Sequence, residues 1–262
     1  MSWLDKALRV LALGAALVCL VAVTHAQAPQ VPELSVQGPT TANATVPRAD
    51  AAPQAYEFLL KDPDHQFPAR WCPATIGFQL DTTLLAQAGL DPAMELGRWR
   101  AVFAGWSEAS DYSYRFEYRG ENKLLMASDG EPDIAAIPPG TIGIVYVHGR
   151  SSAGPAEYRS RAVAGRTAGN GGLQAVSSGN SDASALIADR GFVLIDAYDA
   201  GELEAGSLRR ALYQHESGHA LGLGHVEDRG ALMHDTLSML RLKISSGDAA
   251  GLRELASMPC PS

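Results

Sequence analysis

The sequence predicts one α+β domain, in which short strands are interleaved with a few helices. Several short segments alternate apolar and polar side chains or carry unbroken apolar runs, which are the patterns of half-buried and buried strands. Longer segments carry helix-start residues followed by apolar side chains at helical spacing. The chain has 262 residues, 46% hydrophobic and 19% charged, which is enough to bury one core.

The predicted elements follow one another as strand, helix, strands and helix. Thr75–Leu80 alternates like a strand, and Asp91-Pro92 starts a helix with an N-cap residue and a proline at the first position. A further helix is expected from about Leu208 to Leu223, and the Gly, Ser and Asn-rich stretches are expected to be loops. The remaining strand candidates are Tyr112–Tyr118, Ile134–Ile137, Ile142–Val147, Leu173–Ser177 and Phe192–Asp196.

The pattern H-E-x-x-H-x-x-G-x-x-H begins in the helix predicted for Leu208–Leu223 and ends at His225, just after it. Every fixed position of the pattern is filled. His215 and His219 are four residues apart, so both imidazoles can face one ion from the same side of a helix. A catalytic zinc generally takes three protein ligands and keeps a fourth position for water, and His225 supplies the third ligand. Gly222 and Gly224 can adopt the positive φ that ends a helix and turns the chain back.

Glu216 follows the first histidine and has the position of a general base, which takes a proton from zinc-bound water and passes it to the leaving amine. Zinc lowers the pKa of that water and polarises the substrate carbonyl. The pattern therefore predicts a neutral-pH hydrolase with one catalytic zinc ion and peptide bonds as its target. A chance arrangement is the weaker interpretation, because all five fixed positions of the pattern hold the required residue in a chain with 7 histidines.

The motif and the turn after it resemble the metzincin metalloproteases, most closely the matrixin branch. The segment Ala231-Leu232-Met233-His234-Asp235 is similar to the methionine-containing turn of that family, which lies beneath the metal. The resemblance implies that Met233 is the residue of this Met-turn. It also implies a twisted, mostly parallel sheet with an antiparallel edge strand, packed on two long helices, with the active-site helix followed by the Met-turn.

Three positions depart from the matrixin pattern. Val226 stands where matrixins usually have Ser, and His234-Asp235 replaces the usual Tyr-Pro, so details of the substrate pocket are not carried over. Astacin-like enzymes place a metal-approaching tyrosine at the position of Asp235, so no tyrosine ligand is expected here. His234 could contact substrate or stabilise the oxyanion, or it could be a loop histidine with neither role.

Weaker likenesses to the matrixins extend from about Arg70 to Leu255. Asp248–Leu255 resembles the C-terminal helix of that family, and Trp106–Ala109 resembles the end of its first helix. If the resemblance holds, Leu173–Ser177 is the edge strand that binds extended substrate by strand addition.

Matrixins also bind a structural zinc and calcium. His148 has no ligand pattern near it, so a second zinc site is not expected. Calcium could bind through loop carbonyls and carboxylates such as Asp196 and Asp199, although such groups are more often solvated charges.

The N-terminal region predicts export. In residues 1–28, Lys6 and Arg9 precede an apolar run, and Ala26-Gln27-Ala28 offers small residues for signal cleavage. A signal anchor is the alternative, but the run is short for spanning a bilayer. Residues 29–55 are rich in Pro, Ala, Thr and Gln, which predicts a disordered linker or a short propeptide, and the catalytic domain is expected at 56–262.

Signal removal would leave two cysteines, Cys72 and Cys260, near the ends of the folded region. In an oxidising compartment a disulfide between them is the natural interpretation, and a zinc-blocking thiol at Cys72 is the alternative. The cysteine-containing matrixin propeptide motif is missing, because no cysteine lies between Cys19 and Cys72. Latency through a cysteine switch is therefore not expected.

The formal net charge is −8, and no basic run is present, which argues against nucleic acid or an anionic membrane as partner. The sequence thus predicts a secreted monomer, periplasmic or extracellular, that acts on protein or peptide substrates. A rival hypothesis is an exported zinc-binding module that recognises proteins without hydrolysing them, and intact Glu216 argues against it. A hydrolase of non-peptide amides is a third interpretation.

Overall fold

The computed structural model describes residues 34–35, 55–61, 67–72, 75–123, 126–127, 130–149, 154–163, 167–178, 185–203 and 206–260. All of them belong to one compact unit, Glu33–Ser262. The predicted signal peptide lies outside the described residues, and so does the predicted linker apart from residues 34–35 and 55. In the described part of the chain, no helix has the length and apolar character needed to span a membrane.

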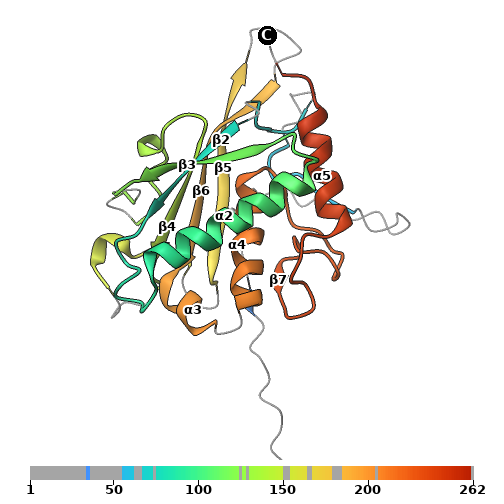
Figure 1. The fold of residues 1–262 in the computed structure, drawn as a ribbon. Coiled ribbons are helices and arrows are strands. Elements are labelled where there is room, and N and C mark those ends of the chain that lie inside the picture. The colour runs from blue at the N-terminus through green and yellow to red at the C-terminus, as the bar shows by residue number, and fades with distance from the viewer. Residues whose placement is uncertain are drawn as a thin grey trace, which may run out of the picture. The chain divides into compact units, whose positions relative to one another are not determined.

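A five-stranded sheet with the order β3-β2-β4-β6-β5 forms the centre of this unit (Figure 1). Four strands are parallel to their neighbours, and the edge strand β5 (Gly169–Ser178) runs antiparallel to β6. This confirms the predicted sheet. The parallel strands are β2 (Thr75–Asp81), β3 (Arg115–Glu121), β4 (Thr141–Val147) and β6 (Ala185–Asp196).

Two long helices, α2 (Pro92–Ala109) and α4 (Gly206–Ala220), contact the sheet and each other, as the matrixin resemblance implies. The Asp91 side chain accepts a hydrogen bond from the Met94 amide at 2.8 Å and so caps α2 as predicted. A third helix, α5 (Ser246–Ser257), packs beside α2. The short helices are α3 (Ala197–Glu202), η1 (Ile134–Ala136) and η2 (Ala156–Tyr158).

Two strand predictions need correction. Ile134–Ile137 was expected to be a strand but forms the 3-10 helix η1, because the Asp133 side chain accepts from the Ala136 amide at 3.3 Å. The strand expected from Tyr112 begins only at Arg115. Asp111 and Tyr112 have positive φ values of 51° and 59° and form the turn that follows α2.

The two ends of the domain are tied to each other and to α4. Cys72 and Cys260 form the predicted disulfide, which leaves no free thiol at Cys72. Beside it, the indole of Trp71 donates to the carbonyl of Ala220 at 2.8 Å, so the last turn of α4 is capped by a distant side chain. Phe58 forms an isolated bridge with Leu223 just beyond the helix. These contacts position the segment that leaves α4.

Candidate metal centre

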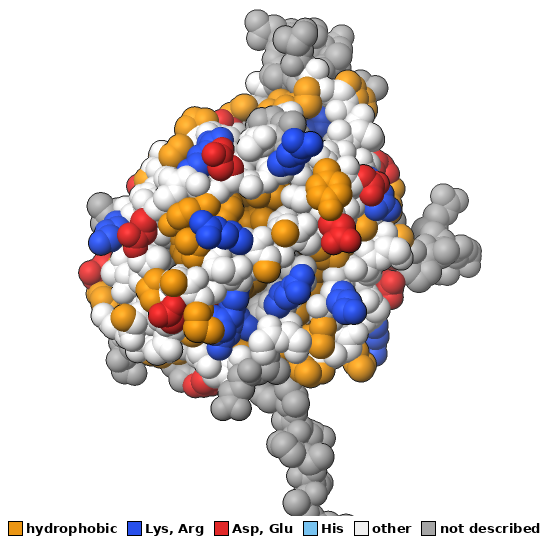
Figure 2. All heavy atoms as spheres, in the orientation of Figure 1, with side chains coloured by type: hydrophobic (Ala, Val, Ile, Leu, Met, Phe, Trp, Pro, Cys, Tyr) orange, Lys and Arg blue, Asp and Glu red, His pale blue; other side chains and the backbone are white. Residues whose placement is uncertain are grey.

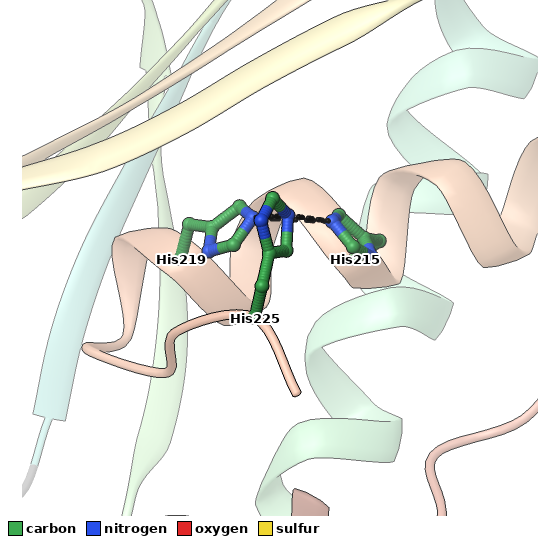
Figure 3. A group of neighbouring side chains, drawn as sticks. All are labelled: His215, His219 and His225. Atoms are coloured by element: carbon green, nitrogen blue, oxygen red, sulfur yellow. Dashed lines mark hydrogen bonds between the residues drawn. The ribbon is translucent and has the colours of Figure 1, made fainter. Parts of the chain in front are cut away.

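Three histidines converge at the C-terminal end of α4 and in the loop after it (Figure 3). The Nε2 atoms of His215 and His219 are 3.1 Å apart, as are those of His219 and His225, and those of His215 and His225 are 3.2 Å apart. Within the described ranges, no other group of three His, Cys, Asp or Glu side chains could share an ion.

Backbone carbonyls orient two of the rings. His215 Nδ1 lies 2.8 Å from the Leu232 oxygen, and His219 Nδ1 lies 2.8 Å from the Leu223 oxygen. A carbonyl only accepts, so each Nδ1 carries the proton and each Nε2 directs a lone pair at the other rings. Burial is the main reason that the pKa of His215 falls to about 3 and that of His219 lies well below its usual value. The rings are therefore neutral at neutral pH.

This donor set fits a zinc ion. Lone pairs that face one another at these distances are unfavourable unless a cation lies between them. Two imidazole nitrogens that each lie 2.0 to 2.1 Å from a tetrahedral zinc are about 3.3 Å apart, close to the spacing of the Nε2 atoms. Carbonyl acceptors on the opposite ring nitrogens are typical of zinc-binding histidines. With three protein donors, the group has the composition of a catalytic site that keeps one position open.

Glu216, next to His215 on α4, is completely buried, and neither carboxylate oxygen has a hydrogen-bond partner among the described residues. Burial raises its pKa well above the usual value. Gly169 and Gly171 in β5 have no side chains, so the backbone of this edge strand packs directly on Glu216. A Cβ atom on Gly169 would lie 2.7 Å from Glu216 Oε1, and one on Gly171 would lie 2.0 Å from the Glu216 carbonyl oxygen. The structure thus holds an unpaired carboxylate between α4 and β5.

The chain reverses direction after α4 so that His225 can reach the other two histidines. Gly222 has a φ of +105°, which confirms its predicted role in ending the helix. The same prediction is wrong for Gly224, whose φ is not in the left-handed region. Gly224 is needed for close approach instead, because a Cβ there would lie 3.2 Å from the Phe58 backbone, and its amide donates to the Glu57 carbonyl at 2.8 Å.

Met233 packs beneath the histidines. A Cβ on Gly218, between the two helical histidines, would lie 2.5 Å from Met233 Sδ, so the glycine makes room for the sulfur. The Met233 carbonyl accepts from the amide of Val226 at 3.0 Å, which links the turn to the residue after His225. Met233 is 1% exposed, and its turn therefore contacts both the helix and the loop that carry the histidines.

A family model described as Matrixin matches residues 180–256, from the start of β6 through α5. The match covers the three histidines, Glu216 and Met233. Residues 180–256 are thus similar to the matrixins, a branch of the metzincin metalloproteases. The match supports a zinc metalloprotease in general, and the family implies zinc for the histidine group. No curated protein matches the chain.

The turn that carries Met233 is held by the carboxylate of Asp248, a role that the sequence did not predict. Asp248, at the start of α5, accepts from the amides of Leu232 at 3.0 Å and Met233 at 3.4 Å. It also accepts from the Ser245 amide at 2.8 Å, and the Ser245 hydroxyl accepts from the Asp248 amide, which forms a capping box. The Ser-x-x-Asp spacing was the available signal, although it predicts only the helix start.

His234 and His148 were the other histidines considered as site residues, and each is held by contacts within the fold. His234 Nδ1 lies 3.1 Å from the Thr236 amide, 3.1 Å from Arg241 Nη1 and 2.9 Å from Asp235 Oδ1, so this nitrogen is engaged within its own loop. The buried His148 has its Nε2 2.9 Å from the Pro155 carbonyl and belongs to no metal-binding group among the described residues.

Asp196, one of the carboxylates considered for calcium, is the N-cap residue of α3. Its Oδ1 accepts from the amides of Tyr198 at 3.0 Å and Asp199 at 3.1 Å, which caps α3, and its Oδ2 accepts from Gly149 at 2.9 Å. Three amide donors therefore engage this carboxylate. In the described part of the chain, neither Asp196 nor Asp199 belongs to a group that could bind a metal ion.

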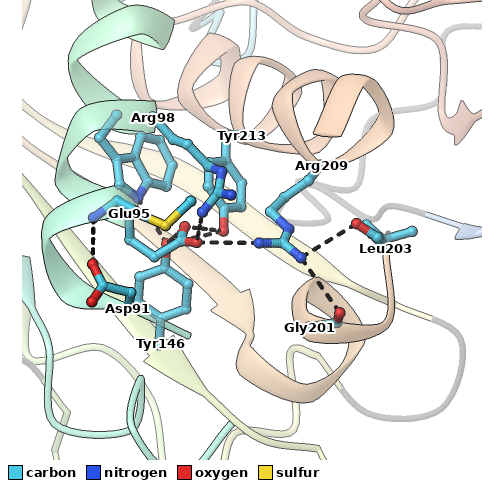
Figure 4. A network of polar contacts seen from close by, with 10 residues as sticks. Asp91, Glu95, Arg98, Tyr146, Gly201, Leu203, Arg209 and Tyr213 are labelled. Atoms are coloured by element: carbon cyan, nitrogen blue, oxygen red, sulfur yellow. Dashed lines mark hydrogen bonds and ion pairs between the residues drawn. The ribbon is translucent and has the colours of Figure 1, made fainter. Parts of the chain in front are cut away.

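A second buried carboxylate, Glu95, ties α2 to α4 and β4 (Figure 4). It accepts hydrogen bonds from Tyr213 at 2.7 Å, from Tyr146 at 2.8 Å and from Arg209 Nη1 at 3.2 Å, and it also pairs with Arg98. Sequence reasoning missed this network, since its members come from separate elements and form no local motif.

Proposed function

We propose that this chain is a secreted, monomeric zinc-dependent endopeptidase, which hydrolyses peptide bonds of protein or peptide substrates by attack of a metal-activated water. The observation that carries the proposal is the triangle of neutral His215, His219 and His225 beside the unpaired carboxylate of Glu216. This combination supplies both a Lewis-acid site and a base, which are the two components of metal-assisted hydrolysis.

The three histidines would hold the zinc ion through their Nε2 atoms. Bound zinc lowers the pKa of a coordinated water and polarises the substrate carbonyl. The carbonyls of Leu232 and Leu223 keep two of the rings in the required tautomer. Met233 supports the site from below, without contributing a ligand.

Glu216 would accept the proton from the attacking water and deliver it to the leaving amine. Its complete burial raises its pKa well above the ordinary value, so this carboxyl group holds a proton more readily than an exposed one and can pass it to the leaving amine. Neither oxygen forms a hydrogen bond with any residue that the structure describes, which leaves both available for this exchange.

The edge strand β5 would bind an extended peptide. β5 is the edge strand in the order β3-β2-β4-β6-β5, so the backbone groups on one of its sides face away from β6. Gly169 and Gly171 bring this strand into contact with Glu216, which places a strand-pairing edge beside the proposed base. A peptide is therefore favoured over a non-peptide amide as the substrate.

The test is cleavage of a mixture of denatured proteins by the full chain, by Glu216→Ala and by Glu117→Ala, with the zinc content of each determined. Glu117 lies in β3 and is exposed, so its variant controls for loss of a carboxylate. We expect wild type and Glu117→Ala to cleave, Glu216→Ala not to cleave, and all three to hold about one zinc. If all bind zinc and none cleaves, the zinc-binding recognition module replaces the protease.

Export is proposed separately, from the basic residues, apolar run and small residues of positions 1–28. The test is the N-terminal sequence of the chain recovered outside the cytoplasm, which should begin at Pro29. Recovery of the chain only with Met1 in place would reject a cleaved signal.

A further inference from the structure

A groove of about 850 Å³ lies between α2 and β3, and none of the proposed zinc ligands lines it. Its helical wall consists of small residues, Ala101, Ala104 and Gly105, which leave room above the helix. Aromatic rings form its floor, where Phe103 stacks on Phe116 with ring centroids 4.6 Å apart. The molecule therefore has an apolar depression that is separate from the metal centre.

The groove includes the outer edge of β3. In the described part of the chain β3 pairs only with β2, and the second sheet, formed by β1 (Leu34–Ser35) and β7 (Thr236–Leu237), is separate from it. Residues 115–118 all line the groove, although alternate side chains of a strand point to opposite faces of a sheet. The backbone groups on the outer side of β3 can therefore pair with an extended peptide in the groove.

Three arginines border the groove: Arg100 on α2, Arg115 on β3 and Arg210 on α4. The Arg100 guanidinium lies over the ring of Tyr118, 5.6 Å from its centroid. Within the described residues, none of the three arginines forms an ion pair. Figure 2 looks onto α2 and shows Lys and Arg side chains on several sides of exposed hydrophobic ones. Because the chain has a formal net charge of −8, this cluster is a local site of attraction for carboxylates.

Two glutamates, Glu108 and Glu117, also line the groove, and neither forms an ion pair with a described residue. The lining thus has one more positive than negative side chain. An unbroken acidic run would be repelled by these glutamates, whereas a basic segment would be repelled by the arginines. The occupant that fits best is an extended peptide in which a few acidic side chains alternate with apolar ones.

We propose that this groove is an exosite, a binding site outside the catalytic centre, for an extended segment of the protein substrate. The segment pairs with the edge of β3, places apolar side chains on the aromatic floor and directs acidic side chains at Arg100, Arg115 and Arg210. This proposal rests on the proposed protease function, and it names acidic proteins as the preferred substrate class.

The sheet separates the exosite from the cleavage site. β3 and β5 are opposite edges of the sheet, four strand spacings or about 19 Å apart. A four-residue peptide spans at most about 14 Å, so it cannot occupy both edges, whereas a protein chain can. The exosite should therefore improve the binding of protein substrates, leave the cleavage of short peptides unchanged and have no effect on the zinc.

Binding is tested in the full chain carrying Glu216→Ala, so that the probe is not cleaved. The probe is a fluorescein-labelled peptide with the repeat Val-Val-Glu-Glu, eight residues long, which gives each face of a strand both side-chain types. Fluorescence anisotropy should show severalfold weaker binding for Arg115→Glu and for Arg210→Glu. Arg161→Glu, at an exposed arginine outside the groove, should bind like the parent.

Two further comparisons give the test opposite signs. Glu117→Gln removes a negative charge from the groove and should bind the probe more tightly, which damage to the fold would not produce. A probe with lysine in place of glutamate, and one with an N-methylated backbone, should both bind much more weakly. Equal affinities of the groove variants and their parent, or equal binding of the glutamate and lysine probes, would overturn the exosite.

The role in cleavage is tested with the active chain and two substrates, a denatured acidic protein and a four-residue peptide. Arg115→Glu and Arg210→Glu should raise KM for the protein severalfold, with kcat for the protein and the rate for the peptide unchanged. Arg161→Glu should match wild type on both substrates. Equal losses on protein and peptide, or no loss on either, would reject a role in substrate capture.

The outcomes separate the exosite from the protease. If the variants change probe binding as expected but no chain cleaves although all hold zinc, the protease and the exosite role both fail, and the groove is the peptide site of a recognition module. If the active chains cleave and probe binding is the same in every variant, the protease stands and the exosite is rejected. A wild-type dimer that Arg115→Glu dissociates in sedimentation would assign the groove to a second copy and overturn the proposal.

Discussion

Two glutamates, Glu95 on α2 and Glu216 on α4, are both completely buried, on helices that pack against each other. Glu95 is surrounded by donors: two tyrosine hydroxyls and two arginines contact its carboxylate. In the described part of the chain, neither oxygen of Glu216 has a hydrogen-bond partner. A buried carboxylate is tolerated when it is paired and hydrogen-bonded, and it costs stability when it is not. The difference indicates that Glu95 organises the fold, and it supports the catalytic role proposed for Glu216.

The neighbours of the two glutamates show the same contrast. Around Glu95, Tyr213 stacks on Trp99 with ring centroids 4.5 Å apart, and Arg209 also donates to the carbonyls of Gly201 and Leu203. Around Glu216, Gly169 of β5 presents no side chain at all. One region is cross-linked by polar contacts, and in the other the backbone of β5 packs directly on an unpaired carboxylate.

The largest expected effect comes from Glu216→Gln. Cleavage should fall by about 10² to 10⁴-fold, the usual contribution of a general base. The free energy of unfolding of the zinc-free protein should not fall, because the amide removes an ionisable group whose charge burial disfavours. Steady-state cleavage and urea unfolding of both proteins measure the two effects. A variant that loses stability while keeping activity would reverse the assignment of the two glutamates.

Glu95→Ala should show the opposite pattern. Removing the carboxylate leaves Arg209 buried without its partner, and breaking a buried pair in this way typically costs about 3 to 5 kcal/mol. Urea unfolding should show this loss, while the folded variant still binds one zinc and cleaves at a rate within severalfold of wild type. Loss of zinc from a folded Glu95→Ala protein would mean that this network also shapes the metal centre.

The contrast between the two glutamates also explains what sequence could predict. Glu216 lies in a pattern of fixed offsets along one helix, so its neighbours His215 and His219 could be placed from helix geometry alone. The parallel sheet followed from the family resemblance. The partners of Glu95 come from α2, β4 and α4, and nothing local in the sequence brings them together.

Some smaller predictions were wrong because local sequence patterns do not include the contacts that decide the structure. Gly222 and Gly224 look equivalent in the sequence, but only Gly222 has the positive φ. Gly224 is needed because the distant Glu57–Phe58 backbone passes beside it. Ile134–Ile137 has a strand-like composition, yet the Asp133 cap gives a 3-10 turn. In each case a contact outside the pattern decided the structure.

Gly171→Ala tests whether the space around Glu216 is functional. The added Cβ would lie 2.0 Å from the Glu216 carbonyl oxygen, so β5 must move away from α4. We expect a loss of about 1 to 3 kcal/mol, as for other overpacked sites, and a larger proportional loss of cleavage than of zinc binding. Gly97→Ala is the control, since nothing lies within 4 Å of its Cβ position and alanine favours a helix. Unchanged cleavage by Gly171→Ala would show that the approach of β5 to Glu216 has no part in activity.

The smallest effect is expected from Tyr213→Phe, which removes one of the donors to Glu95 and keeps the ring that stacks on Trp99. The remaining contacts to Glu95 come from Tyr146, Arg98 and Arg209, so the carboxylate stays paired. The cost should be about 1 kcal/mol, the net contribution of one hydrogen bond, seen as a lower urea midpoint with an unchanged slope. Zinc content and cleavage should match wild type. Because Tyr213 is only two residues from His215 on α4, a loss of cleavage without a loss of stability would instead show that the network around Glu95 acts on the metal centre, and the two buried glutamates would then belong to one functional unit.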